Sequence, residues 1–198
     1  MITSSHPIAD SRSKGDALIV AAPRFYVVSR KKLAVLFMAT VGLYSVYWFY
    51  KNWSNYKQRA VEDAKVDRSI WPVPRGIFAI FFTHALFQDI KYHGRDKAAL
   101  ARWDNKALAT KLVATMIVSN IVDRLSYRGI GSPFTDIASL LILVPLLTQF
   151  LNAQQMINAA CDDPDGESNS RFTEANYAWI VVGVLYWSVI FIAAFMPE

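Results

Sequence analysis

The C-terminal part of the chain contains a long uncharged segment, and this feature limits most strongly what the chain can fold into. Residues 175–197 form 23 consecutive positions without a charged side chain, and most of them are apolar. An α-helix rises about 1.5 Å per residue, so a helix of this length covers the roughly 30 Å hydrocarbon layer of a bilayer. The sequence therefore predicts a membrane-spanning helix here.

Composition and charge extend this prediction to the whole chain. The 198 residues are 54% hydrophobic, and the charged residues are confined to a few stretches between long apolar blocks. Because only helices and closed barrels satisfy the backbone in lipid, we predict an all-α integral membrane helical bundle. The net charge is +5, and basic loops in such proteins contact anionic lipid headgroups. We therefore expect membrane lipids as partners, and no nucleic acid.

The apolar blocks divide the chain into a flexible tail at residues 1–23 and a single transmembrane helical domain at 24–198. Within this domain we predict four spans, at about 33–50, 107–127, 134–155 and 175–197. One further block, 76–90, has only 13 uncharged positions, from Gly76 to Gln88. That length leaves three alternatives open, which are an in-plane helix, a re-entrant helix and a spanning helix.

Aromatic residues crowd the end of the predicted first span. They recur at nearly every turn and lie close to Lys51. Amphipathic rings favour the headgroup level of a membrane, so an interfacial belt is expected, with burial in a protein core as the alternative. The residues are Tyr44, Tyr47, Trp48, Tyr50, Trp53 and Tyr56.

Turn residues and a proline shape the third predicted span. The glycines of the 128–133 segment and its proline predict a tight turn between two helices. Pro145 predicts a kink, with the freed carbonyl satisfied by a neighbour such as Thr148. Several amides follow Pro145, so we expect that half of the helix to face other helices or to leave the bilayer.

The distribution of Lys and Arg leaves the orientation of the N-terminus open. Two topologies, which differ in whether the 76–90 block crosses, give the same excess of basic residues on the cytoplasmic side. Both topologies put residues 91–111 and the acidic segment 162–174 in the cytoplasm. Both also put the C-terminus on the outer side.

Polar residues inside the apolar blocks are the candidate functional residues, because ionisable groups in a membrane are costly. His84, Gln88 and Asp89 lie in the ambiguous block. His84 could relay a proton or contact a ligand, and the alternative is a polar stripe that faces headgroups. We expect Asn120 and Asp123 to pair across helices with Gln149 or Asn152, which would fix helix packing and need no substrate.

Motifs for cofactors and metals are not found in the sequence. Cys161 is the single cysteine, and the acidic segment 162–167 lacks the two carboxylates that a calcium loop needs at its ends. The three histidines have no spacing typical of a metal site, and Gly129 and Gly131 do not form a dinucleotide-binding loop. We therefore expect no cofactor, no metal and no catalytic residue set.

Three stretches of the chain resemble a group of small bacterial multi-span inner-membrane proteins of unknown function. They are YVVSRKKLAVLFMATVGLYSVYWFYKNW at 26–53, WPVPRGIFAIFFTHALF at 71–87 and NSRFTEANY at 169–177. The first carries a VSxxKL…TxGxYxxYWFYKNW signature. The resemblance implies a location in the inner membrane of a Gram-negative bacterium. It implies no catalytic residues.

Three functional hypotheses follow from the sequence. The first is a non-enzymatic accessory or envelope-associated membrane component, which would have a protein partner. The second is a small transporter or channel protomer, whose pore would need a homo-oligomer because so few intramembrane residues are polar. The third is a membrane-embedded enzyme that acts on lipid, and it requires His84, Asp89 and Asp123 to converge at one interface.

Overall fold

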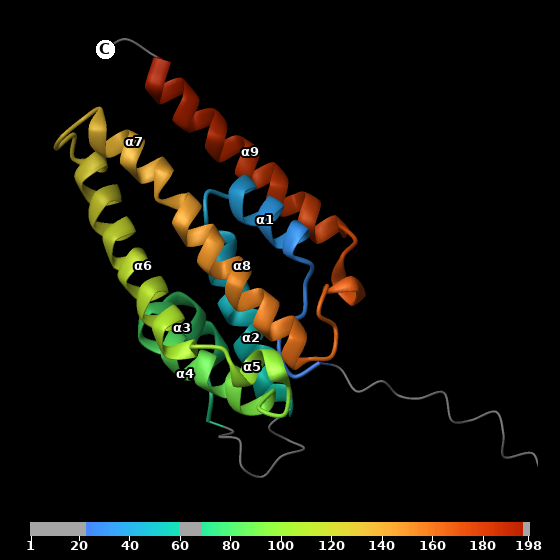
Figure 1. Ribbon diagram of the computed structural model, residues 1–198. Coiled ribbons are helices and arrows are strands. Elements are labelled where there is room, and N and C mark those ends of the chain that lie inside the picture. Colours follow the sequence, from blue (N-terminus) through green and yellow to red (C-terminus); the bar gives the residue numbers. More distant parts are fainter. Residues whose placement is uncertain (1–22, 60–68, 196–198) are drawn as a thin grey trace, which may run out of the picture.

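The computed structural model describes residues 23–59 and 69–195, and within these ranges the chain is entirely helical (Figure 1). Apart from Pro23, the predicted flexible tail lies outside the described residues. The helices are α1 (Arg30–Ala39), α2 (Tyr44–Arg59), α3 (Pro72–Ile77), α4 (Ala79–His93), α5 (Ala98–Ala101), α6 (Asn105–Tyr127), α7 (Phe134–Leu141), α8 (Leu143–Ala160), the short 3-10 helix η1 (Glu167–Asn169) and α9 (Glu174–Phe195).

The predicted first span, 33–50, is not one helix, because the chain turns back on itself between α1 and α2. Val41 and Gly42 both have positive φ angles, 50° and 83°. The hydroxyl of Thr40 donates to the carbonyl of Leu36 and accepts from the backbone N–H of Tyr44 at 3.0 Å. A single side chain thus ends one helix and begins the next, and glycine adopts the left-handed conformation without steric cost.

The position of this turn along α9 shows how far the α1–α2 hairpin extends. Gly183 contacts the last residue of α1 so closely that a Cβ there would lie 1.9 Å from the carbonyl oxygen of Ala39. The indole of Trp187 donates to the carbonyl of Met38 at 3.1 Å. These two positions are about 14 and 20 Å along α9 from its first residue, Glu174. The hairpin therefore reaches only the middle of α9.

A long antiparallel hairpin of α6 with α7 and α8 forms the opposite side of the bundle (Figure 1). The predicted turn at 128–133 is confirmed, with Gly129 and Gly131 at positive φ. The predicted kink is confirmed as a break at Ile142, since the ring of Pro145 excludes the carbonyl four residues earlier. The hydroxyl of Thr148 bonds to the carbonyl of Pro145 and not to the freed carbonyl, in contrast to our expectation.

Loops from distant parts of the chain meet at one end of the bundle, which we call the charged end. The ring of Phe25 stacks on Tyr56 with centroids 5.6 Å apart and meets His93 edge-on at 5.8 Å. Lys97 forms a salt bridge with Asp162. The N-terminal segment, the end of α2, the loop from α4 to α6 and the segment after α8 therefore lie together.

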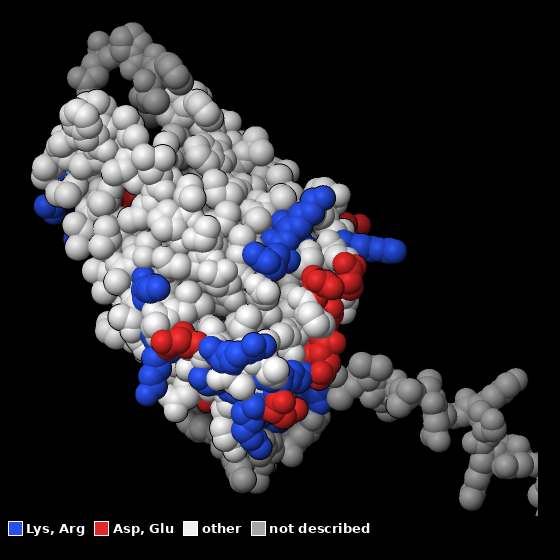
Figure 2. Space-filling view, viewed as in Figure 1, with Lys and Arg blue, Asp and Glu red and all other residues white. Residues whose placement is uncertain are grey.

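Charge is distributed unevenly over the molecule. In the face that Figure 2 shows, Lys, Arg, Asp and Glu gather at the charged end and along the start of α1, while most of the remaining surface is uncharged. The 128–133 turn and the C-terminal end of α9 lie opposite, and we call this the far end (Figure 1). The segments that meet at the charged end, together with the start of α1, carry the cations Arg24, Arg30, Lys31, Lys32, Lys57, Arg59, Lys91, Arg95, Lys97, Arg102, Lys106 and Arg171.

The core lies toward the charged end and is rich in aromatic rings. Tyr44, Trp48 and Trp53 are fully buried, so the predicted interfacial belt is wrong for these three residues, which pack in the protein core. Trp48 meets Phe150 edge-on, with centroids 5.2 Å apart. Ring pairs with this geometry are favourable beyond the area that they bury.

Two helices are long and apolar enough to cross a membrane among the described residues, Phe134–Ala160 and Glu174–Ile192. They correspond to two of the four predicted spans, and the first extends past its predicted end at 155. The helix α6 covers the predicted span 107–127 but carries Lys111, Asp123 and Arg124. The 76–90 block is divided between α3 and α4, and α4 ends at the charged end.

Candidate functional site

Four amide side chains hold the extended segment 24–29 in place, although this segment belongs to no helix. The backbone N–H of Tyr26 donates to the Oδ1 of Asn52 at 3.1 Å, and its carbonyl accepts from Gln154 at 3.0 Å. Asn158 bonds to both the N–H and the carbonyl of Val28, and Asn169 donates to the carbonyl of Val27 at 2.8 Å. The amides thus form the backbone hydrogen bonds that a neighbouring strand would form in a β-sheet.

The buried amides also bond to one another and to the aromatic core. The Oε1 of Gln154 accepts from the indole of Trp48 at 2.6 Å, and its Nε2 donates to Asn158 at 2.6 Å. Asn52 donates to the carbonyl of Trp48 at 2.9 Å. A buried polar network with all its partners present specifies one arrangement of the core. These amides therefore hold the segment 24–29 against the core, and few of their polar atoms are left to act on a substrate.

Sequence reasoning predicted that the amide-rich half of α8 faces other helices or leaves the bilayer, and two of its amides do face other helices. The amides singled out as candidates were Gln149 and Asn152, whereas the fully buried amides are Gln154 and Asn158. The signal was the helical spacing of the apolar neighbours, because Phe150, Ala153 and Ile157 are buried on the same face of α8. Asn152 is exposed.

Lys32 is a buried cation next to this network. Its side chain is 2% exposed, and its ammonium donates to the Oδ1 of Asn169 at 2.7 Å and to the carbonyl of Arg171 at 2.6 Å. Both acceptors are neutral. Burial lowers the pKa of Lys32 below its usual value. The residue connects the start of α1 to the segment that leads into α9.

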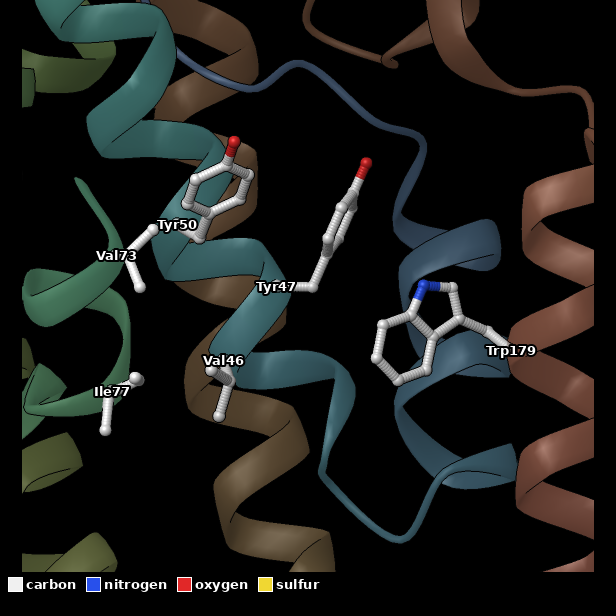
Figure 3. Close-up of a pocket in the computed structure, with 6 residues that line it drawn as sticks. All are labelled: Val46, Tyr47, Tyr50, Val73, Ile77 and Trp179. Carbon is white, nitrogen blue, oxygen red and sulfur yellow. The ribbon is translucent and has the colours of Figure 1, made fainter.

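An apolar groove with a volume of about 340 Å³ lies beside this network, between α2, α3 and α9 (Figure 3). It is open on one side. In Figure 3 the hydroxyls of Tyr47 and Tyr50 point along α2 toward its C-terminal end. The lining residues are Val46, Tyr47, Tyr50, Val73, Ile77 and Trp179.

Close packing of small and aromatic residues forms the walls of this groove. A Cβ on Gly76 would lie 3.1 Å from the carbonyl oxygen of Val46, so the glycine allows α3 to approach α2 closely. Trp179 bridges from α9, with its ring 6.1 Å from Tyr47 and 6.0 Å from Tyr44. Five of the six lining residues belong to the stretches 26–53 and 71–87 that carry the resemblance, and Trp179 follows the third stretch by two positions.

The candidate residues of the ambiguous block do not line the groove. His84 and Gln88 are exposed on α4, and the Nε2 of His84 lies 3.1 Å from the hydroxyl of Thr110 on α6. Asp89 is half-buried, with a hydrogen bond to Tyr56 and the charge of Arg75 nearby. The polar stripe of α4 therefore makes ordinary contacts between helices.

The expected pairs between α6 and α8 are not formed. Asn120 is exposed and donates to the carbonyl of Met116 in its own helix, and Asp123 accepts from Ser119 one turn earlier. Gln149 instead donates to the hydroxyl of Thr115 at 3.0 Å. The Oε1 of Gln149 is buried without a hydrogen-bond partner.

The three residues required by the lipid-acting enzyme hypothesis do not converge. Asp123 is 13 residues beyond Thr110, the contact of His84, which corresponds to about 20 Å along α6. That distance exceeds the reach of a hydrogen bond through one water. The described residues also contain no group of three or more His, Cys, Asp or Glu that could hold a metal.

Comparisons with protein-family models, with curated proteins and with solved structures find no match to this chain. The candidate site is therefore interpreted from its own geometry, which consists of an amide-clamped core and an adjacent apolar groove.

Proposed function

We propose that this chain is a multi-pass inner-membrane protein, built from three crossings and a re-entrant hairpin. The crossings are α6, α7 with α8, and α9, and the hairpin is α1 with α2. The separation of a charged end from a long apolar body is the observation that supports this proposal. Val181, Leu185 and Val189 are exposed on α9. Exposure of such apolar side chains is favourable in lipid and unfavourable in water.

The charged end faces the cytoplasm in this proposal. Because α1 and α2 return to the same end, the N-terminal segment and the C-terminal end of α2 lie on the same side of the membrane in this proposal. Basic loops favour the cytoplasmic side, and among the described residues Arg124 and Arg128 are the cations near the far end. In this proposal the N-terminus lies inside and the 76–90 block does not cross, which is an arrangement that neither of the two sequence-based topologies contained.

The role that this arrangement supports best is that of a non-enzymatic accessory or envelope-associated component. The buried polar groups are used to clamp the backbone of residues 24–29, and the cations at the charged end suit anionic lipid headgroups. The resemblance to small bacterial inner-membrane proteins supports the same location.

Cysteine labelling in spheroplasts tests the proposed topology. In a Cys161→Ser background, Ile130→Cys should react with a membrane-impermeant maleimide added from outside, because residue 130 lies in the far-end turn. Ser168→Cys should react only after permeabilisation. Equal labelling of both positions in intact spheroplasts, or release of the protein by alkaline carbonate, would contradict the proposal.

A homo-oligomeric transporter is the second candidate, and the surface of α6 favours it. Asn120 and Asp123 are exposed on α6, and each bonds only within its own helix. A second copy could satisfy such groups in the membrane. This candidate predicts that Asp123→Asn changes solute flux in proteoliposomes. Unchanged flux would remove it.

A further inference from the structure

The apolar groove between α2, α3 and α9 has the form of a site for one slender molecule. A volume of about 340 Å³ equals that of a cube about 7 Å on a side, and a helix with its side chains is about 10–12 Å across. A groove of this volume cannot enclose a helix from a second copy. An extended hydrocarbon chain is narrower than a helix and needs no hydrogen-bond partners.

The chemistry of the lining changes along the groove. Val46, Val73 and Ile77 present only carbon, and Figure 3 shows the hydroxyls of Tyr47 and Tyr50 pointing in one direction, along α2. Lys51 is four residues after Tyr47, so it lies one turn further along the same face of α2. The groove thus passes from apolar walls to two hydroxyls, and Lys51 follows these tyrosines on α2.

In the proposed membrane location, the two tyrosine hydroxyls and Lys51 lie at the depth at which a lipid with its headgroup at the charged end has its phosphate. The α1–α2 turn lies near the middle of α9, and Lys51 is eight residues beyond Leu43, which is about 12 Å along α2. Half of the hydrocarbon layer is about 15 Å. Lys51 is therefore close to the headgroup level, and its side chain can extend the remaining distance.

The charge of Lys51 determines which kind of headgroup fits. Lys51 is half-buried, and it forms no salt bridge with any residue that the structure describes. Among the lining residues there is no charged side chain. A cation one helical turn beyond the tyrosines of an uncharged groove favours an anionic headgroup over a zwitterionic one.

We propose that this groove binds one anionic phospholipid, with an acyl chain along Val46 and Ile77 and the phosphate at Tyr47, Tyr50 and Lys51. The proposal rests on the proposed membrane location. It identifies the lipid as a bound partner at a defined site, in addition to the general contact between basic loops and headgroups.

Lipid retention by the purified full-length chain tests this site. The protein is reconstituted with a mixture of phosphatidylglycerol and phosphatidylcholine and purified in mild detergent, and the lipid retained is measured by native mass spectrometry. The wild type should retain one phosphatidylglycerol. Ile77→Trp, which fills the groove, should lower retention several-fold. Val35→Trp is the matched control on an exposed position of α1 and should leave retention unchanged.

A second pair of variants tests the headgroup and does not depend on the folding of Ile77→Trp. Lys51→Gln should reduce the preference for phosphatidylglycerol over phosphatidylcholine, and Lys57→Gln on the same helix should keep it. Unchanged retention by Ile77→Trp together with unchanged preference in Lys51→Gln would overturn the groove proposal. Carbonate extraction of the wild type is measured in parallel, and release there would contradict the membrane location instead.

Discussion

The helices α2 and α9 are both rich in aromatic residues, but their large side chains have opposite surroundings. On α2, Tyr44, Trp48 and Trp53 are fully buried among other rings. On α9, Leu185 and Val189 are each 63% exposed. α2 also carries Asn52, which bonds to the N-terminal segment, whereas α9 contacts the rest of the bundle mainly through α1.

This difference shows that hydrophobic content alone does not identify the surroundings of a helix. A helix that contains both polar and aromatic residues, such as α2, can be buried when side chains on other segments form hydrogen bonds with its polar groups. A helix that is apolar on every side has nothing to orient it, so its exposed faces need lipid. The following substitutions separate these two situations, in order of expected effect.

Replacing a core amide should have the largest effect. Gln154→Leu removes the partners of the Trp48 indole and the Tyr26 carbonyl, and each buried group left without a partner costs about 1–3 kcal/mol. We expect a loss of about 3–5 kcal/mol in the free energy of unfolding, measured by denaturant titration in detergent. The exposed Asn152→Leu on the same helix is the control. Equal stability of the two variants would contradict the clamp.

A charge on the exposed face of α9 should have the next largest effect. Leu185→Asp would cost about 2.5–3.5 kcal/mol if lipid surrounds this position, and almost nothing if water does. We therefore expect a reduced fraction of the protein in the carbonate-resistant membrane pellet. Leu185→Ala serves as the control. Full membrane retention of the aspartate variant would show that this face of α9 does not contact lipid.

A substitution at the contact between α9 and α1 should have an intermediate effect. Gly183→Ala puts a methyl group against the carbonyl of Ala39, and overpacking of this kind costs about 1–3 kcal/mol. We expect a lower thermal midpoint and faster proteolysis before Glu174. Ser188→Ala, at an exposed position of α9, should behave as the wild type. A normal midpoint for Gly183→Ala would mean that the two helices pack less closely.

The smallest expected effect is a dependence of stability on pH. Burial lowers the pKa of Lys32 below 10.5, its usual value. Between the lowered pKa and 10.5 the unfolded chain holds a proton that the folded chain has lost, so stability rises with pH in this range. Lys32→Met should lack this rise, and Lys31→Met at the exposed neighbouring position should retain it. Parallel pH profiles for the two variants would contradict the prediction.

The sequence predicted those parts of the fold that depend on local chemistry. The helical class, the 128–133 turn, the break near Pro145 and the helix α9 each follow from glycine, proline or the absence of charge. The α1–α2 turn was missed because the 33–50 block contains no charge. Its signal was the pair Thr40 and Gly42, a capping residue followed by a residue that tolerates positive φ.

The candidate site could not be predicted in the same way, because it depends on contacts between distant segments. Nothing local shows that Asn158 bonds to Val28, 130 positions away. The groove likewise needs Val46, Ile77 and Trp179 from three helices. Periodicity could have selected Gln154 over Asn152, since only the former lies on the face of α8 that carries Phe150 and Ile157.

The α1–α2 hairpin has a consequence for how the chain is inserted into a membrane. In the proposed topology the hairpin returns to the end at which it began, so α1 and α2 can be inserted without moving a polar loop through the bilayer. With the charged end in the cytoplasm, the loop that has to be translocated among the described residues is the short turn after α6. Insertion in this topology would therefore need little export of hydrophilic segments among the described residues.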